Sequence, residues 1–194
     1  PLFAGKVDIH ADRVAGDNPS LLGAKHVADI IRTLEVGIGG RISTYLESTL
    51  TEEKLITNTN NFLDLLCSNF ADLADIRDGY LKPKDLRKRS LLGSVTMLRV
   101  LAGTHREFVS KKTQTDHGED HPKRQKQFAT FLNDLSHHME APVSKTSHWL
   151  ESKAFLENAM APTARTGDMR DLTTHILAWA HKRPHWLKER SSER

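Results

Sequence analysis

Apolar residues recur at helical spacing in almost every segment of the chain, whereas the alternating pattern of a β-strand is scarce. The first clear example predicts a short amphipathic helix over about 23–35, with apolar side chains at i, i+3, i+4 and i+7: Val27, Ile30, Ile31 and Leu34. The glycines of the segment GIGG at 37–40 would stop this helix, and they lack the spacing of a nucleotide-binding loop. The pattern as a whole predicts an all-α fold, with about six helices in one domain over 1–194.

A long second helix is expected to begin at a capping box formed by Thr49 and Glu52 and to end near residue 77, before Asp78-Gly79. Its buried face is predicted to carry Leu55, Thr59, Phe62, Leu66, Phe70 and Leu73. Cys67 lies beside that face and is interpreted as a small buried hydrophobe rather than a reactive thiol.

The segment at about 90–109 is apolar around most of its circumference over the first three turns. A helix of this kind packs against neighbours on several sides, so it is predicted to be the central helix of the fold.

The remaining sequence alternates between helical and irregular segments. Three segments without a sustained helical pattern are an extended lead-in at 1–20, an exposed and mobile loop at 110–123, and a frayed tail at 184–194. Further helical segments are expected at about 122–139, around 149–156, and at about 169–181 after a cap at Asp168. The inner face of the first of these is predicted to carry Phe128, Phe131, Leu132, Leu135 and Met139.

Length and composition narrow the class of protein. The 194 residues, with 38% hydrophobic and 27% charged side chains, fit a globular domain, and no apolar run reaches the roughly 20 residues of a membrane span. A single cysteine favours a reducing compartment, and no secretion signal is visible, so we expect a cytoplasmic protein. The chain begins with Pro-Leu-Phe, which leads us to expect a piece of a longer protein.

Charge is distributed unevenly along the chain. Residues 1–81 contain 7 Lys and Arg against 12 Asp and Glu, a net −5, whereas residues 82–194 contain 21 against 13, a net +8. Such asymmetry is compatible with a surface that meets a polyanion, and equally with solvated helix faces.

The densest basic group predicts a phosphate-binding surface just before the central helix. Between 82 and 89 there are five cations and one acid, and the free N–H groups of the following helix would add to their attraction for phosphate. The expected nucleic-acid-binding residues are Lys82, Lys84, Arg87, Lys88 and Arg89, with Lys111, Lys112, Arg165 and Arg170 as extensions. The alternative is that these side chains serve solubility or pair with the acidic first half.

Recognisable catalytic and metal-binding patterns are not found in the sequence. The eleven histidines include close groups such as His117 with His121 and His137 with His138, but none has an established zinc spacing. No nucleophile elbow or phosphate loop is present, so we expect no catalytic site, metal or cofactor within this chain.

The order of several segments resembles the C-terminal helical half of the DGQHR-domain family. The similar segments are PLFAGKVD at 1–8, the helix ending near Leu34, SLLGSVTMLRVLA at 90–102, WL at 149–150, APTAR at 161–165 and the segment 171–180. The family motif Asp-Gly-Gln-His-Arg belongs to an N-terminal ParB-like half and does not occur in this sequence. The resemblance implies a bacterial cytoplasmic protein that binds DNA and regulates genes of DNA modification of the phosphorothioation type, with any nucleotide chemistry in the other half.

Two functions therefore stay open at the level of sequence. The first is a DNA-binding or regulatory domain that contacts the phosphate backbone through the basic surface. The second is a non-catalytic scaffold that packs on the N-terminal half or forms a homo-oligomer, through the apolar start at 1–3 or an exposed Trp186.

Overall fold

The computed structural model describes residues 7–8, 18–42, 50–110 and 120–189. In these ranges the structure is built from α-helices, and its one sheet has two short parallel strands, β1 (Val7–Asp8) and β2 (Leu22–Gly23). The prediction of an all-α fold is confirmed. None of the helices in this part of the chain is long and apolar enough to cross a membrane.

Helix α1 (Ala24–Val36) matches its predicted bounds to within a residue, and it buries Ile30, Thr33 and Leu34. It ends at Gly37, which has a φ of 80° and donates its N–H to the Thr33 carbonyl. The interpretation of the GIGG segment as a helix stop is thus confirmed, because a side chain would be strained at this φ.

The predicted second helix is two helices, α3 (Glu52–Asn69) and α4 (Ala71–Asp78). The N-cap is Thr51, whose hydroxyl accepts from the Lys54 N–H, while Thr49 lies outside the described residues. The break falls at Phe70, whose extended backbone (φ −120°) lets its fully buried ring enter the core and turns the chain into α4. Gly79 ends α4 in the left-handed conformation, as expected. Cys67 is buried, and burial raises the pKa of its thiol to about 11.

The predicted helix over 90–109 is also interrupted. The basic residues form a helix of their own, α5 (Pro83–Arg89), which is followed by a 3-10 turn (Leu91–Gly93), α6 (Val95–His105) and a π-helical turn (Arg106–Ser110). The serines at 90 and 94 cap the two later elements, accepting from Leu92 N–H and Met97 N–H. Gly93 allows the chain to fold back on α5, since a Cβ there would lie 2.5 Å from the Arg87 Cα.

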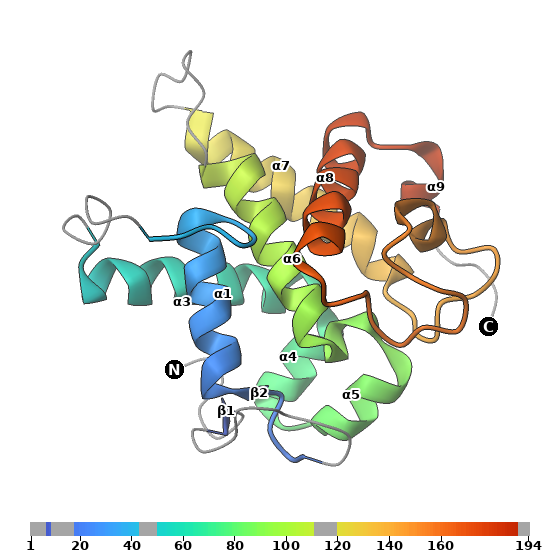
Figure 1. Cartoon of the computed structure of the whole chain (residues 1–194), viewed down its shortest axis with the longest axis horizontal. Helices are drawn as coiled ribbons and strands as arrows, with labels where there is room; N and C mark the ends of the chain where they lie inside the picture. The colour runs from blue at the N-terminus through green and yellow to red at the C-terminus, as the bar shows by residue number, and fades with distance from the viewer. Residues whose placement is uncertain (1–6, 9–17, 43–49, 111–119, 190–194) are drawn as a thin grey trace.

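Helix α6 runs through the middle of the arrangement, between α1 and α8 (Figure 1). Seven of its eleven residues are buried, all of them between Met97 and Thr104. Helix α7 (Asp120–Leu135) continues into a 3-10 turn (Ser136–His138), and all five residues of its predicted inner face are buried.

The C-terminal part differs most from expectation. A 3-10 turn (His148–Ser152) buries Trp149, but Leu156 is 74% exposed. The last long helix, α8 (Thr166–Lys182), begins before Asp168, which lies in its first turn rather than at its cap. The predicted frayed tail includes helix α9 (His185–Lys188), which is held by the fully buried Leu187; residues 190–194 lie outside the described residues.

Trp186 is half-buried rather than exposed. Its ring stacks on His148, with 4.1 Å between ring centroids, and meets Trp179 edge-on. The apolar start at 1–3 lies outside the described residues.

Candidate nucleic-acid interface

Helix α5 presents a face of lysines because its apolar side chains point into the core. Pro83 and Leu86 are buried, and Lys84 and Lys88 stand one turn apart on the exposed side, with Lys82 at the N-cap. None of the three lysines forms an ion pair with a residue that the structure describes. We call Lys82, Lys84 and Lys88 the α5 lysine face.

Arg87 has a different role from its lysine neighbours. Its guanidinium donates to the carbonyls of Asn18 (3.0 Å) and Ser20, and more weakly to Leu21 (3.5 Å). Burial lowers its pKa. In this geometry Arg87 fixes α5 against segment 18–21. Its predicted contact with phosphate stays a prediction.

Arg89 lies at the edge of the α5 lysine face and forms an ion pair with an acidic residue. One of its terminal nitrogens is 2.6 Å from an Asp72 carboxylate oxygen, and its side chain is 54% exposed. A surface ion pair of this kind contributes little stability, so Arg89 can exchange Asp72 for another anion.

The residues predicted to extend the phosphate-binding surface do not belong to α5. Arg165 is exposed at the N-cap of α8, whereas Arg170 donates from Nε to the Ile38 carbonyl at 3.0 Å and so attaches α8 to the turn after α1. Lys111 and Lys112 lie outside the described residues.

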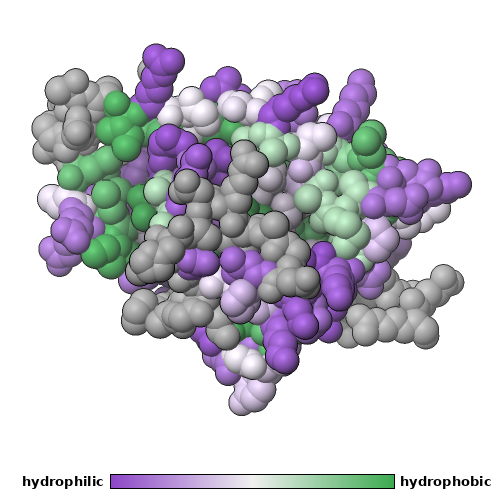
Figure 2. Space-filling view, turned by 60° about the horizontal axis from the view of Figure 1, so that its bottom comes forward, coloured by the Kyte–Doolittle hydropathy of each residue, from purple (hydrophilic) through white to green (hydrophobic). Residues whose placement is uncertain are grey.

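Sequence reasoning missed Lys25, which belongs to the same end of the molecule. The pKa of His26 is lowered mainly by burial. The charge of Asp29 opposes this shift, and the charges of Arg99, Lys25 and Arg87 add to it, which places these three cations near His26. Lys25 is exposed in the first turn of α1. It lies 57 or more positions before the α5 lysines, so no local sequence pattern connects them. Figure 2 turns this end toward the viewer and shows hydrophilic residues in its lower central part.

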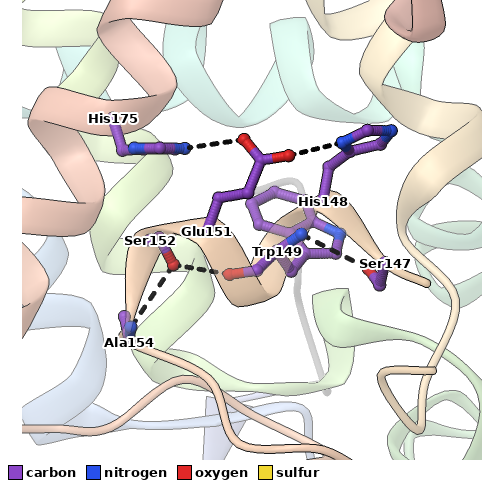
Figure 3. Close-up of polar contacts among 7 residues, drawn as sticks. All are labelled: Ser147, His148, Trp149, Glu151, Ser152, Ala154 and His175. Atoms are coloured by element: carbon purple, nitrogen blue, oxygen red, sulfur yellow. Dashed lines mark hydrogen bonds and ion pairs between the residues drawn. The ribbon is translucent and has the colours of Figure 1, made fainter. Parts of the chain in front are cut away.

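A second polar cluster lies in the C-terminal part, where Glu151 stands between two histidines (Figure 3). One carboxylate oxygen is 2.6 Å from His148 Nδ1, and the other is 3.9 Å from His175 Nε2. Ser147 and Ser152 are occupied in backbone bonds: Ser147 Oγ accepts from the Trp149 N–H, and Ser152 Oγ donates to the Trp149 carbonyl. Among the described residues, no group of three or more side chains is arranged to hold a metal ion.

Comparison of the chain with family models, with curated protein sequences and with solved structures finds no match.

Proposed function

We propose that this chain is a DNA-binding domain that contacts the phosphate backbone through the α5 lysine face, with Arg89 at its edge. The observation that carries the proposal is the exposure of three neighbouring lysines, none paired with a described residue, on a helix whose orientation Arg87 fixes. Lysine ammonium groups on flexible stems act as point charges that neutralise phosphates wherever these lie along a strand.

Contacts of this type carry no information about base sequence. They position a protein on a duplex and release counterions, so affinity depends steeply on salt. Lys25 would extend the contact along the same end of the molecule.

The resemblance to the DGQHR-domain family supports a more specific role for such a domain. On that basis we propose that the chain belongs to a bacterial, cytoplasmic regulator associated with DNA modification, in which a further N-terminal half carries any nucleotide chemistry. No catalytic residue is assigned to this chain.

The test is the affinity of the variant Lys84→Glu/Lys88→Glu for two labelled duplexes of unrelated sequence. We expect affinity to fall about 10-fold or more at about 0.1 M salt, by the same factor for both duplexes, because two phosphate contacts become repulsive. The matched control is Lys182→Glu, an exposed lysine at the end of α8, which should bind like the parent.

Unchanged affinity of the double variant for DNA would show that α5 is not part of the interface. Absence of binding by the parent chain, even at low salt, would favour a scaffold that packs on another part of the protein.

A further inference from the structure

A polar cavity of about 350 Å³ lies where four helical elements meet, at the opposite end of α1 from the segment that Arg87 holds. Its walls come from the end of α1, the part of α3 between Lys54 and Asn61, the end of α6 with the following Arg106, and the first turns of α7. The volume falls in the range of small-molecule sites.

The floor of the cavity contains an imidazole that stays uncharged at neutral pH. The His105 ring lies between Phe62 and Phe128, with ring centroids 5.3 Å and 5.5 Å away. Burial, with the charge of nearby His121, lowers its pKa to about 4. Nδ1 is enclosed and has no hydrogen-bond partner among the described residues, which leaves Nε2 as the ring nitrogen with access to the cavity.

The walls carry three carboxamides, from Asn58, Asn61 and Gln125. Asn58 Nδ2 donates to the Glu35 carboxylate at 2.9 Å, which leaves its carbonyl oxygen as an acceptor. Asn61 is exposed, and its carboxamide forms no hydrogen bond with a described residue. A carboxamide matches the paired donor and acceptor on the edge of a purine base, as Asn and Gln do with adenine in DNA complexes.

The lysine, arginine and glutamate side chains that line the cavity are Lys54, Arg106 and Glu35, and the Glu35 carboxylate accepts from Asn58. Lys54 is exposed there and forms no ion pair with a described residue, whereas Arg106 is occupied by the Glu35 carbonyl and the Glu107 carboxylate. A ligand that reaches the floor with an uncharged hydrogen-bonding group would therefore leave an anionic group beside Lys54.

We propose that this cavity binds a purine nucleoside monophosphate, with the base among the carboxamides above His105 and the phosphate beside Lys54. This site is independent of the proposed DNA contact on α5, and it would hold a free nucleotide rather than a duplex.

The experiment is calorimetric titration of the whole chain with adenosine 5′-monophosphate, adenosine and ribose 5-phosphate. We expect saturable binding of the monophosphate at one site and about 10-fold weaker binding of each of the other two probes. Asn61→Ala should weaken binding of the monophosphate about 10-fold. Lys54→Glu should make the affinity for the monophosphate no higher than the affinity for adenosine. Both substitutions are on exposed positions of α3, so neither disturbs the core.

Three matched variants control the test. Thr57→Ala and Lys126→Glu change exposed residues of α3 and α7 that do not line the cavity, and both should bind like the parent. Lys84→Glu/Lys88→Glu should also leave monophosphate binding unchanged, which separates this site from the α5 lysine face. Absence of saturable binding of all three probes would overturn the proposal, as would equal affinity for ribose 5-phosphate or insensitivity to both Asn61→Ala and Lys54→Glu.

Discussion

Arg87, Arg106 and Arg170 each donate to a backbone carbonyl far away in sequence. Arg87 bonds to Asn18 and Ser20, Arg106 Nε donates to the Glu35 carbonyl at 3.0 Å, and Arg170 Nε donates to the Ile38 carbonyl. Two of these carbonyls lie at or just after the end of α1, where a helix leaves carbonyls without an internal partner. A guanidinium has five donors in a fixed plane, which suits this role better than an ammonium group does.

At the scale of single residues, Arg87→Met is expected to lower the free energy of unfolding by about 2–3 kcal/mol. The substitution keeps most of the apolar stem and leaves the carbonyls of Asn18 and Ser20 without a charged donor. Lys88→Met, on the exposed face of the same helix, should change the free energy of unfolding by less than about 0.5 kcal/mol. Urea unfolding followed by circular dichroism measures both, and equal stability of the two variants would contradict the assigned role of Arg87.

Two glycines allow the same substitution to be compared in opposite backbone conformations. Gly79 ends α4 with a φ of 86°, whereas Gly167 lies in the first turn of α8, and a Cβ at either position would meet nothing within 4 Å. An added methyl group therefore clashes with nothing at either position. The backbone conformation alone decides whether alanine stabilises or destabilises the protein.

At the scale of the helix, Gly79→Ala should destabilise the protein by about 1 kcal/mol, since alanine is strained in the left-handed region. Gly167→Ala should stabilise it by about 0.5–1 kcal/mol, because alanine favours the helix and restricts the unfolded chain. The midpoints of thermal unfolding should move in opposite directions. Shifts of the same sign would contradict the described ends of α4 and α8.

All three tryptophans of the chain lie together with histidines in the C-terminal part. His138 meets Trp186 edge-on, and His175 meets Trp179 edge-on, at 5.0 Å and 4.6 Å between ring centroids. Burial lowers the pKa of His138, and burial likewise lowers that of His175 against the opposing effect of Glu151. Both histidines are therefore held in the neutral form more strongly in the folded state than in the unfolded state.

The sign of the pH dependence follows from these shifts. Below the unfolded pKa of about 6.5 the unfolded chain binds more protons at these positions, so stability is lost as pH falls from about 6.5 through the folded pKa values. Urea unfolding followed by tryptophan fluorescence should show lower stability at about pH 5.5 than at about pH 7.5. His175→Gln should flatten this difference, whereas His185→Gln should not, since the His185 side chain is 92% exposed. A protein that is more stable at the lower pH would contradict the described burial.

At the scale of the whole molecule, the sequence predicts the elements better than their junctions. The helix at Ala24–Val36 and the buried face of α7 follow from apolar spacing, because each helix has one side against the core. The break at Phe70 has no glycine or proline to mark it, and it results from how the ring of Phe70 fits the core. Such tertiary effects override local propensity.

The candidate surface was likewise predictable only in part. Charge density alone singles out Lys82, Lys84 and Lys88, which the structure leaves exposed, but it cannot tell them from Arg87, whose partners lie 66 or more positions earlier. The nucleotide cavity is made of side chains from four helical elements between Leu34 and Gln125, and no single sequence window contains them.

The salt dependence of DNA binding by the parent chain tests the central proposal most directly. With three lysines and Arg89 on phosphates, log K should fall against log salt concentration with a slope of about −3 to −4 between about 50 and 200 mM salt. The Lys84→Glu/Lys88→Glu variant should reduce the magnitude of this slope by about 2. A slope that is the same in both proteins, or no binding at about 50 mM salt, would contradict a phosphate-binding face on α5.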